Sequence, residues 1–155
     1  MQITLPADGS VLIKGKAETV SLKDTVTINS YVLPGQGEYD VAGVQCEGFN
    51  LSAGLVYFIR LEDLQLTYLS QIDSGVSKLD DASNCNILIV DVRSDDTADS
   101  LKGIIKNVEP SFVILCGAGA TPEFRTALNL PTQEIGTFKI SRAGLPLEGT
   151  TILHS

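Results

Sequence analysis

Apolar and polar residues alternate with a period of two through most of the first half of the chain. In Lys16–Leu22 the side chains of Val20 and Leu22 share one face, and in Thr25–Val32 those of Val26 and Ile28 do. This period is typical of strands with one buried face. We therefore predict strands at Gln2–Leu5, Ser10–Lys14, Lys16–Leu22, Thr25–Val32, Tyr39–Glu47, Leu55–Leu61 and Gln65–Leu69. Turn residues at 6–9 and 62–64 join two pairs into hairpins, so nearly half of the chain is predicted as antiparallel meander.

The pattern changes in the second half, where Asn86–Val92 is a continuous apolar run, as expected for a strand covered on both faces. A helix is predicted next, because Leu101, Ile104, Ile105 and Val108 recur at helical spacing before Pro110. The following elements are a buried strand at Phe112–Cys116, a short helix at Glu123–Leu128, and closing strands at Thr137–Ser141 and Thr150–Leu153. Strand, helix and strand from 86 to 116 form a parallel βαβ unit, which makes the fold class α+β in one domain spanning 1–155.

The stretch from Leu33 to Gly48 combines a glycine-rich turn with an extended segment. Pro34, Gly35 and Gly37 predict a tight turn, after which Glu38 to Val44 reads as strand. Glu38 beside a glycine is either a functional carboxylate or an acceptor of backbone N–H groups in the turn. We expect the structural role for both Glu38 and Tyr39.

Composition and charge exclude several classes of function. Of 155 residues 43% are hydrophobic, only 19% are charged, and the net charge is -8. Such a chain has no electrostatic footprint for nucleic acid and is a poor partner for anionic membranes. We find no signal-peptide pattern and no apolar run of membrane-spanning length, and expect a soluble cytoplasmic protein. Cys46, Cys85 and Cys116 are few and widely spaced, which indicates reduced, buried thiols.

Several short motifs, taken in order, carry a resemblance to a known family. The chain begins Met1-Gln2-Ile3-Thr4-Leu5, continues with Ser10-Val11-Leu12-Ile13-Lys14-Gly15, and carries PGQGEYDVAGV over residues 34–44. In this order they resemble the metallo-β-lactamase fold, and more closely its UlaG-like group of metal-dependent hydrolases. The resemblance covers nearly the whole chain. It implies a truncated αββα sandwich of mostly antiparallel sheets with one βαβ unit.

The same resemblance implies that the metal site of the family is missing. Its first histidine falls near Asp8-Gly9, its histidine-rich segment falls in the short stretch from Asp24 to Leu33, and its bridging aspartate falls at Gln71. Its last histidine falls at Gly117, so every ligand position is empty. The only histidine, His154, is penultimate, and we expect it in a frayed tail. We therefore expect no metal, no cofactor and no catalytic residues of the family's kind.

Other chemistries receive little support from the residues. Zinc hydrolysis needs about three protein ligands, which one terminal histidine and three scattered cysteines cannot supply. The acidic pairs Asp80-Asp81 and Asp95-Asp96 lack the spacing of a calcium loop. Asp91 ends an apolar strand, where a doubly wound fold would place an acidic site. We expect instead that it caps a helix or forms an ion pair with Arg93 or Arg125. Gly117 and Gly119 form a lone GxG, which is weak evidence for phosphate binding. Cys116 has no histidine to activate it and is interpreted as a buried thiol.

Two functions from different classes remain after these exclusions. The first, which we favour, is a non-catalytic pseudoenzyme acting in binding or assembly with a protein partner. The alternative is a small-molecule-binding protein or metal-independent enzyme that uses the remnant cleft. We expect this cleft to be lined by Gln71, Asp91, Cys116, Gly117 and Gly119. A third arrangement, in which another chain completes the site, stays open.

A homodimer is the partner that the sequence itself suggests. The uncharged run Thr25–Val32 would protect a free sheet edge poorly, and relatives place part of a sheet's cover in the segment that is missing here. A two-fold partner would bury such an edge most simply, whereas internal pairing of the run is the competing interpretation.

Overall fold

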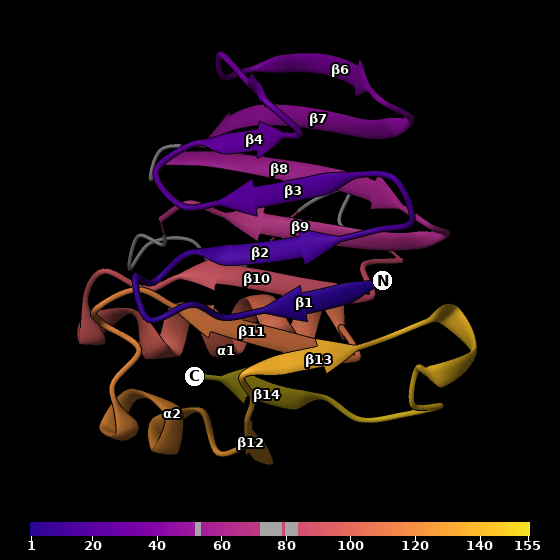
Figure 1. Cartoon of the computed structure of the whole chain (residues 1–155). Coiled ribbons are helices and arrows are strands. Elements are labelled where there is room, and N and C mark those ends of the chain that lie inside the picture. The colour runs from indigo at the N-terminus through magenta and orange to yellow at the C-terminus, as the bar shows by residue number, and fades with distance from the viewer. Residues whose placement is uncertain (52–53, 72–78, 80–83) are drawn as a thin grey trace.

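The computed structural model describes residues 1–51, 54–71, 79 and 84–155, which form two stacked β-sheets with helices on one side (Figure 1). The smaller sheet has six strands in the order β13 (Thr137–Lys139), β1 (Gln2–Thr4), β2 (Val11–Lys14), β3 (Thr19–Leu22), β4 (Val26–Ile28) and β5 (Tyr31–Val32). The larger sheet has eight, in the order β12 (Thr132–Glu134), β14 (Thr151–His154), β11 (Phe112–Cys116), β10 (Ile87–Asp91), β9 (Leu64–Leu69), β8 (Gly54–Leu61), β7 (Val44–Leu51) and β6 (Gly37–Val41).

The smaller sheet is antiparallel throughout, and its edge strand β13 comes from the far end of the chain. Ile3 of β1 pairs with Ile13 of β2 on one side and with Phe138 of β13 on the other. The Met1 amino group donates to the carbonyl of Ile140 at 3.1 Å, across 139 positions of sequence. The first and last parts of the chain are therefore joined within one sheet.

The larger sheet is antiparallel from β6 to β9 and parallel from β9 to β12. β9, β10, β11 and β14 run in the same direction, with Ile87 opposite Leu66 on one side and Phe112 on the other. The predicted βαβ unit is confirmed as β10, α1 (Ala98–Val108) and β11. The predicted hairpins β1–β2 and β8–β9 are confirmed as well.

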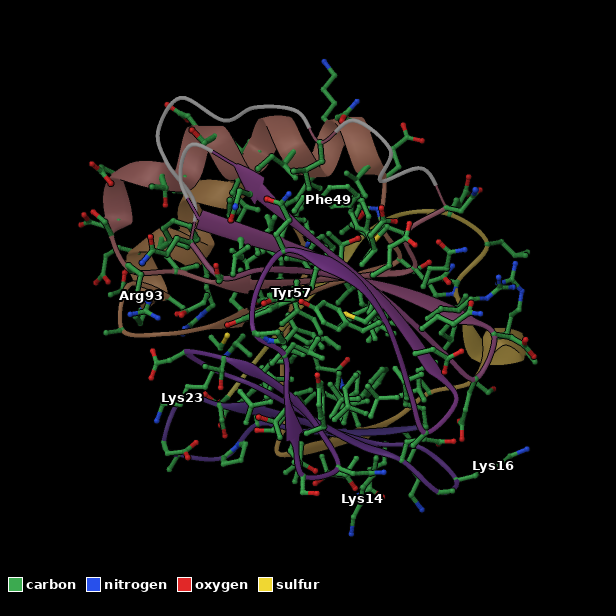
Figure 2. The ribbon with its side chains drawn as sticks, turned by 90° about the horizontal axis from the view of Figure 1, so that it is seen from above. Lys14, Lys16, Lys23, Phe49, Tyr57 and Arg93 are labelled. Atoms are coloured by element: carbon green, nitrogen blue, oxygen red, sulfur yellow. The ribbon has the colours of Figure 1, made fainter. Side chains whose placement is uncertain are left out.

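The two α-helices of the described residues lie on the outer face of the larger sheet. Leu101, Ile104 and Ile105 of α1 and Phe124 of α2 (Pro122–Leu128) pack against alternate residues of β10, β11 and β14, such as Leu88. Two 3₁₀-helices, η1 (Asp95–Thr97) and η2 (Arg142–Gly144), complete the helical elements among the described residues. Viewed from above, helices, larger sheet and smaller sheet form three successive layers (Figure 2).

The predicted αββα arrangement therefore differs from the structure in its second helical layer. Within the described ranges no α-helix covers the outer face of the smaller sheet. The reason is local, because β1 to β5 follow one another through short turns that leave no room for a helix between strands. The described architecture is αββ.

Two predicted strands are each broken by a turn. Thr25–Val32 reverses at Asn29, whose φ is 54° and whose side-chain Oδ1 accepts a hydrogen bond from the Thr19 amide at 3.0 Å. Tyr39–Glu47 reverses at Ala42 and Gly43, with φ of 52° and 82°. Left-handed backbone of this kind suits tight hairpins. β6 and β7 are consequently an antiparallel pair, with Tyr39 opposite Cys46.

The core is divided into two apolar layers. The first lies between the sheets and includes the fully buried Ile3, Ile13, Ile89 and Ile114. The second lies between the larger sheet and the helices. Because β10 and β11 contribute to both layers, their side chains are buried on both faces, as the continuous apolar runs predict. No helix in the described residues is long and apolar enough to cross a membrane.

Candidate functional site: a charged cleft at the carboxyl ends of the parallel strands

The carboxyl ends of β10, β11 and β14 meet at one edge of the larger sheet, because these strands run parallel. Two turns of the smaller sheet face this edge, one between β1 and β2 and one between β3 and β4. They enclose a cleft of about 470 Å³. Its charged lining consists of Asp8, Lys23, Asp24, Asp91, Arg93 and Arg125.

A bridge of three charged side chains spans the cleft. Arg93 donates from Nε to Asp91 Oδ2 at 2.8 Å, and its Nη2 lies 2.6 Å from the same oxygen. The same Nη2 donates to Asp24 Oδ1 at 3.1 Å. Arg93 therefore links β10 of the larger sheet to the β3–β4 turn of the smaller one. Figure 2 shows Arg93 level with the larger sheet and Lys23 level with the smaller one, on the same side of the molecule.

Burial controls the ionisation of this bridge. The side chain of Asp91 is 8% exposed, whereas those of Arg93 and Asp24 are 48% and 74% exposed. Loss of water raises the pKa of Asp91, and the hydrogen bond and charge of Arg93 oppose that rise. The neighbouring carboxylate raises the pKa of Arg93, which keeps the guanidinium charged. The predicted ion pair between Asp91 and Arg93 is confirmed. Arg125 instead donates to the carbonyl of Ala120 at 2.7 Å.

The two glycines after β11 bring its loop against the end of β10. Gly117 has a φ of 89°, and a Cβ at this position would overlap Asp91 Oδ1 and the carbonyl of Val92. Gly119 donates its amide to that carbonyl at 2.8 Å. A Cβ on Gly119 would lie 2.8 Å from the backbone of Arg93. The GxG pattern thus serves close backbone packing around the charged bridge.

Cys116 is a thiol at the end of β11 that lines the cleft. Its Sγ donates to the carbonyl of Val90 at 3.3 Å. Burial, with the nearby charge of Asp91, raises the pKa of Cys116 to about 12. Such a thiol is protonated at neutral pH and is a poor nucleophile. All three cysteines are free, and Cys46 and Cys85 are buried as predicted, whereas Cys116 is partly exposed.

Three of the five residues predicted for the cleft line it, namely Asp91, Cys116 and Gly117. Gly119 packs behind the lining, against the chain that follows β10. Gln71 is exposed just after β9 and is not part of the described lining. The segments where the resemblance placed two ligand positions of the family, near Asp8-Gly9 and from Asp24 onward, reach the cleft through Asp8, Gly9 and Asp24.

His154 was predicted in a frayed tail, and this prediction is wrong. It is the last residue of β14, opposite Glu134, and its carbonyl accepts from the amide of Ile135 at 2.7 Å. Because β14 runs parallel to β11, His154 reaches the cleft edge. Its position after the apolar Ile152-Leu153 was a usable signal, since a residue that ends a parallel strand lies at the edge where such strands carry their sites.

No three His, Cys, Asp or Glu side chains converge as a metal-binding group in the described ranges. Asp95 and Asp96 lie exposed at the start of the helical region, where acidic residues favour the helix dipole. The pair Asp80-Asp81 falls outside the described residues.

The role predicted for Glu38 also needs correction. Glu38 is exposed on β6, opposite Glu47, and accepts no turn amide among the described residues. Tyr39 holds the turn instead, since its hydroxyl donates to the carbonyls of Gly35 at 2.8 Å and Gln36 at 3.1 Å. Glu38 and Glu47 border a second hollow of about 560 Å³ on the outer face of the larger sheet.

These features define a class of fold, in which an antiparallel sheet is stacked on a mixed sheet and a polar cleft lies where the parallel strands end. No family model and no curated protein matches the sequence. Among solved structures, the chain is similar to a candidate Zn-dependent hydrolase of the metallo-β-lactamase superfamily from Thermotoga maritima. The TM-score is 0.72, the sequence identity is 14%, and the match covers 100% of both chains. The chain therefore has the metallo-β-lactamase fold.

Proposed function

We propose that the protein is a non-catalytic member of this fold that acts in binding or assembly with a protein partner. The observation that carries the proposal is the bridge of Asp91, Arg93 and Asp24. A buried carboxylate needs a cation close by, and here a tethered guanidinium supplies that charge. Arg93 gives the cleft carboxylates a partner without a metal ion. The protonated Cys116 thiol supports the same conclusion.

The direct test is metal content together with hydrolysis. Purified protein is dialysed against buffer without chelator, and zinc, iron and manganese are measured by elemental analysis. Lactam, lactone and phosphodiester substrates are assayed with and without added zinc. We expect well under one metal ion per chain and no turnover. About one ion per chain, or zinc-dependent hydrolysis, would overturn the proposal.

A second function is favoured by the cleft itself. A volume of about 470 Å³ is in the range of small-molecule sites, and Lys23, Arg125 and His154 add polar groups beyond the bridge. The protein would then bind a small molecule or act as a metal-independent enzyme. Native mass spectrometry after incubation with a metabolite extract separates the two functions. A retained small molecule that is lost in Arg93→Ala favours the cleft.

A further inference from the structure

The outer face of the smaller sheet differs in charge from the rest of the molecule. Its inward residues, such as Ile3, Ile13 and Val20, lie in the core, so the alternate residues point outward. The register places these in two rows, Lys139, Gln2, Lys14 and Thr19 in one, and Thr137, Thr4, Leu12, Ser21, Thr27 and Val32 in the other. The face thus carries two lysines and no carboxylate, in a chain with 19 acidic residues and a net charge of -8.

The charged residues are distributed unequally between the two ends of this face. Lys14 and Lys139 flank Gln2 at one end, and Lys16 follows at the next turn. Figure 2 shows Lys14 pointing away from the larger sheet and Lys16 extending sideways, at the opposite side of the molecule from Lys23. At the other end lie the turns with Asp8 and Asp24, whose side chains are 60% and 74% exposed. Lys23 shares this end, 4.0 Å from Asp8. The first end carries three lysines, with the carboxylate of Glu18 in the same turn as Lys16. At the second end Lys23 and Arg93 balance Asp8 and Asp24. The first end is therefore the more basic one.

We propose that this face binds a second copy of the chain, with the two smaller sheets stacked face to face and their strands reversed. Two chains of net charge -8 repel through most of their surfaces, and the repulsion is least at a face without carboxylates. A two-fold axis in the interface, perpendicular to the strands, places the lysine row of each copy over the Asp8 end of the other. Each ionic contact then occurs twice, as closed two-fold symmetry requires.

This arrangement rests on the proposed function in one respect, since it identifies the protein partner as a second copy. It differs from a dimer joined through the edge of the smaller sheet. That edge is β5, only two residues long, with Tyr31 49% and Val32 52% exposed. Ile28 of the neighbouring strand is fully buried and faces the core, so a substitution there would disturb the core and would not test an edge contact.

The experiment is sedimentation equilibrium of the full chain from 1 to 100 µM, with variants that separate face from edge. We expect a wild-type mass of twice 16.5 kDa at the upper concentrations. Lys14→Glu with Lys139→Glu should raise the dissociation constant at least tenfold. Lys106→Glu, a charge reversal on α1, and Tyr31→Lys, at the edge, should change it less than threefold. Melting curves show that each variant is folded.

A charge swap tests the orientation. Lys14→Glu alone and Asp8→Lys alone should each weaken the dimer, and the two together should recover at least half of the loss, because each reversed charge again meets its opposite. A wild-type monomer at 100 µM overturns the interface, and so does a dimer that Tyr31→Lys disrupts while the lysine reversals do not. Absence of recovery overturns the reversed stacking. None of these results depends on metal content, so failure here is distinct from failure of the non-catalytic proposal.

Discussion

The two sheets differ in the number of faces that the described chain covers, and this difference decides where their polar groups lie. In β10 all five residues are buried, because helices cover one face and the smaller sheet covers the other. In β10, β11 and β14 polar side chains are confined to the strand ends, where Asp91 and His154 lie. In the smaller sheet every second residue points outward, so its polar residues spread over a face. The strands that are covered on both faces therefore end in a cleft, and the smaller sheet presents a surface.

The largest expected difference comes from deleting a leucine in each sheet. Leu88 of β10 is fully buried against the helices, whereas Leu12 of β2 points outward and is half-buried. Leu88→Ala should lower the free energy of unfolding by about 2–5 kcal/mol, since it leaves a cavity. Leu12→Ala should cost less than about 1 kcal/mol in monomeric protein. Urea denaturation measures both values. Equal losses of stability would contradict the conclusion that β10 is covered on both faces and β2 on only one.

Removing the guanidinium of the bridge should have the next largest effect. Arg93→Ala leaves the Asp91 carboxylate buried without its partner, which should cost about 1–3 kcal/mol at pH 7.5. Arg93→Lys is the matched control and should lose less, since a cation remains. Thermal and urea unfolding of the three proteins give the values. An Arg93→Ala protein as stable as the wild type would show that the bridge does not stabilise the fold.

The pH dependence of that loss follows from the raised pKa of Asp91. A carboxyl whose pKa is higher in the folded than in the unfolded protein lowers stability as pH rises from the unfolded to the folded value. Without Arg93 the folded pKa should rise further, because Arg93 opposes the effect of burial. The difference between Arg93→Ala and wild type should therefore be small near pH 4 and full above neutrality. A difference independent of pH would assign the loss to packing.

The smallest effect is expected at the edge of the larger sheet. Tyr39→Phe removes the hydroxyl that donates to the carbonyls of Gly35 and Gln36, and should cost about 0.5–1.5 kcal/mol. Glu38→Ala removes an exposed carboxylate that faces Glu47, so stability should stay the same or rise slightly. Melting temperatures measured side by side test this contrast. A larger loss in Glu38→Ala than in Tyr39→Phe would restore the structural role of Glu38.

Continuous or alternating apolar runs predicted the strands well, because each run has one register that buries its side chains. Phe112–Cys116 has the same bounds in the sequence and in the structure. The turns at Asn29 and Ala42 were missed because neither lies in a Gly- or Pro-rich cluster, and an alanine with φ of 52° is uncommon. β12 was missed because all three of its residues are exposed and show no apolar pattern.

The candidate site was predictable only in part, because local sequence brings together only some of its residues. Asp91 and Cys116 end adjacent strands of a βαβ unit and Gly117 follows the second, so local sequence brings them together. Lys23 and Asp24 reach the same cleft from the other sheet, through packing between the two apolar faces, and no short pattern encodes that approach. The bridge from Arg93 to Asp24 spans 69 positions.

The pairing of β1 with β13 has a consequence for the time course of folding. The two strands lie near opposite ends of the sequence, with Gln2 opposite Lys139. Closing a loop of this length costs conformational entropy, and chains dominated by distant contacts fold slowly. During synthesis β1 can pair with β2 early, yet its other edge must wait until Thr137–Lys139 leaves the ribosome. Until then Gln2–Thr4 is an open strand edge, the kind of surface that chaperones shield and that aggregates recruit. We expect newly made chains to be most vulnerable in that interval.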